Sequence, residues 1–310
     1  MPIKNNSARP FLKWAGGKTQ LIDTFQKYYP AELKSGKIKQ YIEPFLGSGA
    51  VFFDVVKNFD VGSAFLGDIN DELILVWRVI QNDVEKLIGI LERYARKYKQ
   101  LDNEKRKQVF YDVRKTYNQH RFKINYKTYS ENWVSRAAQL IFLNRTCFNG
   151  LFRMNSKGEF NTPTGDYKNP KICDAQNLFM VAEILQIAEI RTLHFTDIQK
   201  TVEKNSFVYF DPPYRPLSKT AHFTSYSRFQ FNDEQQIELA KLFTQLDKKQ
   251  SKLMLSNSDP KNVNPQDDFF DDLYKEYNLF RVKANRMINS DKAKRGPINE
   301  ILVTNYRVTG

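Results

Sequence analysis

The chain has 310 residues, 41% of them hydrophobic, and a formal net charge of +13 from 48 Lys and Arg against 35 Asp and Glu. This composition can fill a core, so it excludes a chain disordered throughout, and the length allows one large domain or two of roughly 100–200 residues each. The positive charge favours a polyanionic partner, and 16 Tyr and 24 Phe favour nucleic acid over a membrane surface because bases stack on aromatic rings.

Two cysteines, Cys147 and Cys173, are too few for a disulfide framework, and the three histidines show no zinc-ligand spacing. We therefore expect no metal site. The N-terminal residues lack the apolar stretch of a signal peptide, and no apolar run of about 18 residues occurs. These features predict a cytoplasmic protein, associated with the nucleoid when it is on DNA, with no membrane-spanning segment.

Strand and helix patterns alternate at both ends of the chain. Near the N-terminus the expected strands are 39–45 and 61–68, and helical stretches follow at 50–58 and 71–81. From Glu189 onwards the expected strands are 190–195, 206–210, 251–256, 279–284 and 300–306, with a helix at 233–246. This alternation predicts an α/β fold with a doubly wound, parallel sheet.

A different pattern lies between these two parts. Residues 87–130 hold 12 Lys and Arg against 4 Asp and Glu, a local charge of 12 − 4 = +8, with eight Tyr or Phe among them. Helical patterns continue to about Leu143, and a Gly-, Asn- and Pro-rich stretch with Lys157-Gly158 as a hairpin turn follows. We expect a mainly helical module inserted into the sheet domain, which gives domains 1–86, 87–188 and 189–310.

Residues 14–19 contain two glycines before Lys18, but a phosphate-binding loop would require a further glycine where Leu12 stands. Taken alone, this segment predicts the start of a helix with a solvated lysine, although a lysine beside two glycines at a helix start could instead bind a carboxylate. The next motif, Glu43–Gly49, is a glycine-rich turn after a strand, where the backbone can approach a ligand closely. Asp68 follows about 20 residues later and is placed to hold ribose hydroxyls, although it could instead cap the helix that begins near Asn70.

The most informative motif is Asp211-Pro212-Pro213-Tyr214, directly after the apolar strand 206–210. The two prolines remove backbone donors and stiffen the exit from the strand. A carboxylate, a bare carbonyl and an aromatic ring then stand at a strand end, where open α/β sheets bind ligands. This set suits a planar base with an amino group, which would donate to Asp211 and Pro212 while Tyr214 stacks on the ring.

Segments 13–18, 43–49, 68–70, 144–165 and 211–214 occur in the order found in one family. The sequence resembles the Dam-type adenine-N6 DNA methyltransferases, especially the GATC-modifying enzymes of bacteria and phages. Segments 223–231, 256–258 and 293–306 match as well, so the resemblance covers nearly the whole chain. It implies a Rossmann-like domain that uses S-adenosylmethionine (AdoMet), interrupted by a target-recognition domain that carries a β-hairpin.

The resemblance also implies roles for individual residues. The expected cofactor-binding residues are Trp14, Lys18, Glu43, Phe45, Gly47, Gly49, Asp68, Ile69 and Asp211, and the expected catalytic residues are Asp211, Pro212 and Tyr214. The expected DNA-binding residues are Lys13, Phe148, Asn149, Leu151, Arg153 and Pro163, with Arg153 reading a guanine. Asp166 stands where the family often has Arg, so one DNA contact is expected to be lost.

The sequence therefore predicts a monomeric adenine methyltransferase that acts on a flipped-out base in double-stranded DNA, within GATC, without a metal. Two alternatives stay open. A related enzyme that methylates an amino or amide nitrogen of RNA or protein would usually carry Asn at position 211. A non-catalytic DNA-binding protein on this scaffold would be expected to lose Asp211 or the glycine loop, and both are present.

Overall fold

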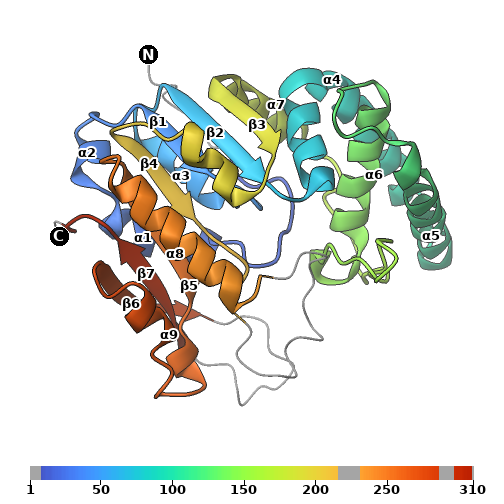
Figure 1. Ribbon diagram of the computed structural model, residues 1–310. Helices are drawn as coiled ribbons and strands as arrows, with labels where there is room; N and C mark the ends of the chain where they lie inside the picture. Colours follow the sequence, from blue (N-terminus) through green and yellow to red (C-terminus); the bar gives the residue numbers. More distant parts are fainter. Residues whose placement is uncertain (1–7, 216–230, 286–296, 309–310) are drawn as a thin grey trace.

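The computed structural model of this chain describes residues 8–215, 231–285 and 297–308. Segment 223–231 of the sequence analysis, apart from Phe231, and residues 293–296 lie outside these ranges. Within them the fold is built around one seven-stranded sheet with helices on both faces (Figure 1). The strands are β1 (Gln40–Glu43), β2 (Ser63–Asp68), β3 (Ala188–Thr192), β4 (Ser206–Phe210), β5 (Lys252–Ser258), β6 (Asn278–Asn285) and β7 (Pro297–Thr304).

The strand order is β3-β2-β1-β4-β5-β7-β6, and every neighbouring pair is parallel except those that involve β7. The expected α/β fold is thus confirmed, but the sheet is mostly and not wholly parallel, because β7 runs antiparallel to both β5 and β6. The described helices are α1 (Ile22–Phe25), α2 (Ala31–Lys34), α3 (Ala50–Asn58), α4 (Asp71–Lys99), α5 (Asn103–His120), α6 (Asn132–Thr146), α7 (Ala175–Ile184), α8 (Asp233–Asp247) and α9 (Phe269–Leu273).

The expected strand 190–195 was wrong at both ends, because β3 runs from Ala188 to Thr192. Leu193 still donates its N–H to the carbonyl of Asp68, the last residue of β2. His194 then caps a 3₁₀ helix, Phe195–Lys200, through a reciprocal bond with Asp197. This local cap ends the extended conformation before the apolar pattern itself ends.

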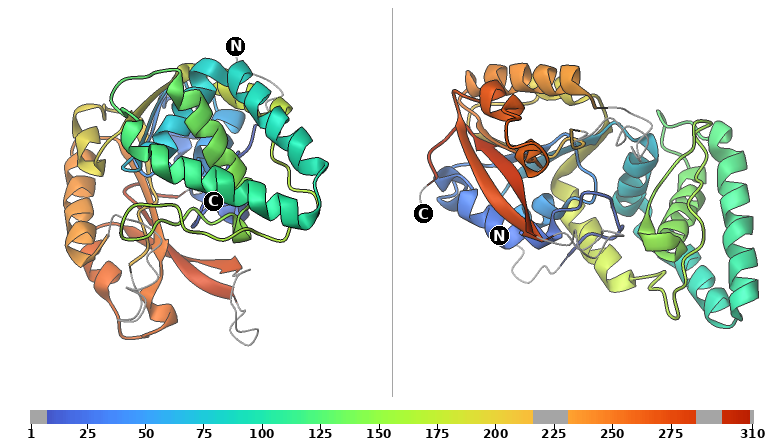
Figure 2. Two further views of the ribbon diagram at one scale, coloured as in Figure 1. Left: turned by 90° about the vertical axis from the view of Figure 1, so that its right-hand side faces the viewer. Right: turned by 90° about the horizontal axis from the view of Figure 1, so that it is seen from below.

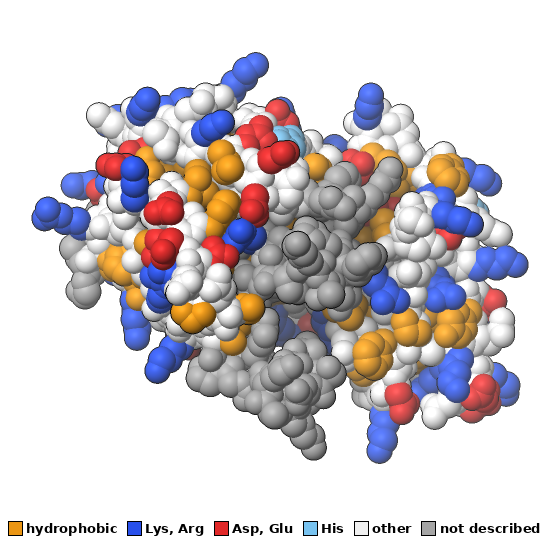
Figure 3. Space-filling model, turned by 60° about the horizontal axis from the view of Figure 1, so that its bottom comes forward, with side chains coloured by type: hydrophobic (Ala, Val, Ile, Leu, Met, Phe, Trp, Pro, Cys, Tyr) orange, Lys and Arg blue, Asp and Glu red, His pale blue; other side chains and the backbone are white. Residues whose placement is uncertain are grey.

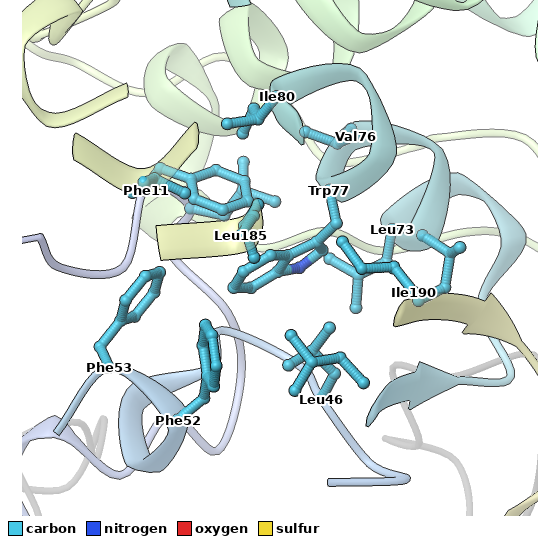
Figure 4. Close-up of a cluster of buried hydrophobic side chains, with 14 of the residues drawn as sticks. Phe11, Leu46, Phe52, Phe53, Leu73, Val76, Trp77, Ile80, Leu185 and Ile190 are labelled. Carbon is cyan, nitrogen blue, oxygen red and sulfur yellow. The ribbon is translucent and has the colours of Figure 1, made fainter. Parts of the chain in front are cut away.

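Both faces of the sheet are covered because each central strand is apolar on both sides. In β4, Phe207 and Tyr209 pack into the core under the N-terminal helices, while Val208 and Phe210 pack under α8. Trp77 of α4 is fully buried, and it lies among the residues that join α3, α4 and β3 (Figure 4). Its ring stacks on Phe53, with the ring centroids 5.6 Å apart.

Helix α4 is longer than expected, since it continues from Asp71 to Lys99 and leaves helical geometry only at Asp83. Its second half packs with α5 and α6 in a helical lobe beside the sheet (Figure 2). The expected domain boundary after residue 86 therefore falls within α4, just beyond this kink. A buried ion pair between Arg136 of α6 and Glu72 of α4 ties the lobe to the sheet-side end of α4.

Residues 147–165, which follow α6 in the chain, form a hairpin-like loop. Backbone bridges join Cys147 to Thr164 and Met154 to Phe160. Between them, the side chain of Asn155 accepts the N–H groups of Lys157 and Glu159, and Gly158 takes a left-handed φ of 72°. The expected hairpin turn at Lys157-Gly158 is confirmed.

Candidate active site

The carboxyl ends of β1 and β4 lie side by side at the centre of the sheet. From β1 the chain moves outward on one side through β2 and β3, and from β4 it moves to β5 on the other side. The loops that follow β1 and β4 therefore diverge, and we call the region between them the crevice, because open α/β sheets bind ligands at such a point of the strand order. Glu43 ends β1 and the rest of its motif, up to Gly49, follows it, while Asp211–Tyr214 follows β4, so both sequence motifs meet at this crevice.

The turn after β1 needs glycine at two positions. Gly47 and Gly49 take left-handed φ values of 48° and 67°. A Cβ atom on Gly49 would lie 2.6 Å from the buried Trp77 ring, and one on Gly47 would lie 3.1 Å from Trp14. No larger residue fits without moving these rings, so the two glycines hold the loop close to the start of α3.

Asp68 lies across from this loop at the end of β2. Its carboxylate accepts the backbone N–H of Gly47 at 3.1 Å and that of Asn70 at 3.0 Å. Asn70, not Asp68, caps α4, because its side chain accepts the N–H groups of Glu72 and Leu73. The alternative interpretation of Asp68 as the helix cap is therefore wrong. Burial raises the pKa of Asp68 to about 6, although the two backbone donors oppose this rise.

Three further residues of the expected cofactor site differ in exposure. Ile69 is exposed next to Asp68, and Phe45 is half-buried, stacked on Phe195 with centroids 5.4 Å apart. Glu43 is buried, and its carboxyl group accepts a hydrogen bond from Tyr41. Burial raises the pKa of Glu43 well above its ordinary value. The sequence analysis missed Phe195, which extends the apolar wall beside Phe45.

Lys18 lies inside the crevice, so the expectation of a solvated lysine was wrong. Its side chain is only 3% exposed, and its Nζ lies 2.8 Å from Oδ1 of Asp211. It also donates to the hydroxyl of Tyr214 at 2.7 Å and to the carbonyl of Gly16 at 3.2 Å. Burial alone would lower the pKa of Lys18, but Asp211, Tyr214 and Glu300 outweigh it and hold the pKa above its ordinary value.

Asp211 has one saturated and one available oxygen. Oδ1 faces Lys18 and accepts the hydroxyl of Ser256 at 3.2 Å, whereas Oδ2 has no hydrogen-bond partner among the described residues. The side chain of Gln236 reaches the carbonyl of Pro213, and no described donor reaches that of Pro212. Two acceptors, Asp211 Oδ2 and the Pro212 carbonyl, are thus left at the strand end. Burial raises the pKa of Asp211, and Lys18 opposes the rise.

Two polar residues that the sequence analysis did not assign complete this cluster. Tyr214 donates its hydroxyl to Oε1 of Glu300 at 2.6 Å, and Ser256 bonds both Asp211 and the buried hydroxyl of Tyr209. Ser256 and Glu300 come from β5 and β7, and both are buried. A polar residue inside an otherwise apolar strand is the sequence signal that could have identified them.

The expected DNA-binding residues gather on and beside the hairpin. Arg153 donates its Nε to Asn161 at 2.8 Å, and no described acceptor occupies its two terminal nitrogens. The carbonyl of Pro163 accepts the N–H of Phe148, whose ring is 53% exposed. The same region holds Asn149, Leu151 and Lys13. The side chain of Lys13 lies against Gly150, because a Cβ atom added to this glycine would clash with it. Asp166 follows the hairpin and is exposed.

The N-terminal segment connects this hairpin to the crevice. The buried side chain of Asn144 accepts the N–H of Lys13 at 2.9 Å and donates to the carbonyls of Lys13 and Gly150 at 2.8 Å. Trp14, whose ring borders Gly47, stacks on Phe152 of the hairpin at 5.3 Å. Residues 13–18 therefore touch the hairpin at one end and Asp211 at the other.

The lobe that carries the hairpin presents many Lys and Arg side chains among exposed hydrophobic ones (Figure 3). Among the described residues, no cluster of three or more His, Cys, Asp or Glu side chains is arranged to hold a metal ion. In the same part of the chain, no helix combines the length and the apolar character that crossing a bilayer requires.

Comparisons with known proteins agree on one family. The sequence profile described as "D12 class N6 adenine-specific DNA methyltransferase" matches residues 14–288. The chain is 49% identical over 300 residues to the type II methyltransferase M.MjaIII of Methanocaldococcus jannaschii, covering 96% of this chain and 99% of the relative. It is 38% identical to the type II methyltransferase M1.LlaDCHI of Lactococcus lactis subsp. cremoris, with 96% and 95% covered. The DNA adenine methylase of Escherichia coli K12 is 32% identical, with 95% and 94% covered.

Proposed function

The chain belongs to the D12 class of N6 adenine-specific DNA methyltransferases, and we propose that it transfers the methyl group of AdoMet to an adenine within GATC. The single observation that carries the proposed chemistry is the pair of acceptors at the end of β4, Asp211 Oδ2 and the Pro212 carbonyl, to which no residue within 8–215, 231–285 or 297–308 donates. These two acceptors lie next to Tyr214 in sequence, and the loop with Gly47 and Gly49 follows the neighbouring strand β1.

The residues at the crevice fit AdoMet. Gly47 and Gly49 carry no side chains, so the backbone of this loop can approach a ligand closely, and Asp68 can accept hydrogen bonds from ribose hydroxyls. Phe45 and Ile69 offer apolar surface beside Asp68, and Trp14 and Lys18 close the opposite end. The cluster around Lys18 holds more carboxylates than cations, which suits a cationic ligand. When it is bound, AdoMet supplies an electrophilic methyl group on a positively charged sulfur.

The protein activates the amino group by position and electrostatics. Asp211 Oδ2 and the Pro212 carbonyl each accept one N–H of the adenine amino group, so the nitrogen moves towards a tetrahedral geometry and its lone pair becomes available. Tyr214 stacks on the ring and fixes its plane. Lys18 and Ser256 hold Asp211 Oδ1, which prevents the carboxylate from turning away. The adenine must leave the duplex to reach these groups, so we infer base flipping.

We also propose that residues 87–188 form the target-recognition domain. Asn118 of α5 bonds both the N–H and the carbonyl of Phe160, and Arg114 reaches the carbonyl of Thr162, so the basic helix and the hairpin act as one unit. The excess positive charge of this segment would bind the DNA backbone without regard to sequence. Arg153, oriented by Asn161, keeps both terminal nitrogens for the two acceptors of a guanine.

Methylation of DNA from a host that lacks adenine methylation tests the recognition site. With the wild-type gene, modified adenines should lie in GATC. Arg153→Ala should lose about 1–3 kcal/mol of discrimination at the guanine and methylate sites altered there. Lys97→Ala, which removes an exposed lysine of α4, is the matched control, because it should lower methylation of all sites alike. If Arg153→Ala keeps the full wild-type preference, another residue reads the guanine.

Replacement of Asp68 by Ala should weaken AdoMet binding by about 1–3 kcal/mol, the range for losing a charged hydrogen-bond acceptor. The binding should also depend on pH. The carboxylate accepts from ribose hydroxyls more strongly than the protonated acid does, so the affinity of the wild type should fall as the pH drops below the Asp68 pKa of about 6. Calorimetric titration between pH 5 and pH 8, with Asp68→Ala as the control that lacks this step, measures both effects. Equal affinity of the two proteins at neutral pH would remove Asp68 from the site.

A further inference from the structure

We propose that Glu300 is a positioning residue for methyl transfer, which fixes the ring of Tyr214 against the target base. The inference rests on the proposed function, because it gives a role to a side chain that acts on the base only through Tyr214. Glu300 lies on β7, directly opposite Ser258 of β5, and therefore at the edge of the crevice that Asp211 lines.

The hydroxyl of Tyr214 is held on two sides. It donates to Oε1 of Glu300 at 2.6 Å and accepts from Nζ of Lys18 at 2.7 Å. Lys18 also contacts Asp211 and the carbonyl of Gly16, so its three protons are all in use. The tyrosine can rotate only by breaking at least one bond to a charged group. A ring fixed in this way offers a flat surface of constant orientation to a base.

Glu300 has features that a residue serving only packing would not need. Its side chain is 8% exposed, and its second oxygen, Oε2, is buried without a hydrogen bond among the described residues. That oxygen lies 3.7 Å from Nζ of Lys18. Keeping a buried carboxylate with one unsatisfied oxygen costs stability. An apolar residue at this position of β7 would avoid that cost. We therefore infer that the carboxylate serves to accept the hydrogen bond from the Tyr214 hydroxyl through Oε1.

A double-mutant cycle tests the role. Glu300→Leu removes the acceptor, and the single-turnover rate of DNA methylation should fall about 10- to 100-fold, as for a lost hydrogen bond to a charged group. Tyr214→Phe should cost a similar factor. The double variant should be no slower than the slower single variant, because both changes break the same contact. Glu300→Gln keeps a neutral acceptor and should recover most of the rate, to within about 10-fold of the wild type.

A second measurement follows the base instead of the reaction. A duplex with 2-aminopurine in place of the target adenine should fluoresce more brightly with Glu300→Leu than with the wild type, because a mobile Tyr214 ring stacks less well on the flipped base. Methylation by the wild type tests the proposed function on its own, whereas the ratios between variants test only this inference. Losses that multiply in the double variant, or a Glu300→Gln variant as slow as Glu300→Leu, would overturn it.

A matched variant controls for loss of a buried carboxylate as such. Glu72 is also buried, accepts the hydroxyl of Tyr126 at 2.7 Å and pairs with a cation, Arg136, but it lies in α4 outside the crevice. Glu72→Leu, the same substitution at this second site, should lower the thermal unfolding midpoint and leave the single-turnover rate and the 2-aminopurine signal of the folded protein unchanged. If Glu300→Leu behaves in the same way as Glu72→Leu, Glu300 is structural and the proposal fails.

Discussion

Asp211→Asn should reduce methyl transfer about 10²- to 10³-fold or more while the protein stays folded and continues to bind DNA. The wild-type carboxylate presents Oδ2 as an acceptor, and no described residue occupies it. An asparagine has the same shape, but in one orientation its amide NH₂ group places a donor where the adenine amino group needs an acceptor. In the other orientation the NH₂ group points at the Lys18 ammonium, which is itself a donor. Asp211→Ala removes the acceptor altogether and should be at least as inactive.

The measurement is a single-turnover methylation assay together with a DNA-binding titration of the same protein. Asp60→Asn is the matched control, because Asp60 is an exposed aspartate paired with Lys39 away from the crevice. It should methylate at the wild-type rate. A near-wild-type rate for Asp211→Asn would refute the assignment of the amino-group acceptor. Loss of DNA binding in step with the rate would instead indicate a folding defect.

Lys18→Met should destabilise the protein by about 3–5 kcal/mol and also abolish methyl transfer. The side chain is buried, and its removal leaves Asp211 and Glu300 close together without their cation. By contrast, Lys39→Met removes the lysine of an exposed ion pair and should change the free energy of unfolding little, since water screens such pairs. Denaturant unfolding of both variants at neutral pH gives the comparison, and equal losses would contradict a buried role for Lys18.

The pH dependence of the Lys18→Met variant supplies a second criterion. Burial already raises the pKa values of Asp211 and Glu300 in the wild type, and Lys18 opposes both shifts. Without Lys18 the two pKa values rise further, so the folded state binds protons more tightly than the unfolded state. The free energy of unfolding should therefore increase as the pH falls from 7 towards about 5, and more steeply than for the wild type. A flat profile would mean that the two carboxylates relax into solvent.

The features that depend on neighbouring residues could be predicted from the amino-acid sequence. Alternating strands and helices predicted the α/β fold, and the left-handed turns at Gly47, Gly49 and Gly158 fall where the sequence has glycine. The strand 206–210 and the helix 50–58 have the bounds that were expected. These features could be read from the chain because backbone geometry and the period of apolar residues are local properties.

Which polar groups contact one another depends on the folded arrangement of distant segments. Lys18 contacts Tyr214 across 196 positions of sequence, and Tyr214 contacts Glu300 across 86. No local pattern distinguishes a buried lysine from a solvated one, because burial depends on the distant strands that close around it. For the same reason the sequence left open whether Asp68 caps a helix, whereas in the fold Asn70 is the cap and Gly47 of the neighbouring loop donates to Asp68. The charge of a side chain belongs to its own residue, whereas its pKa and its partner are set by what the folded chain brings within a few ångströms.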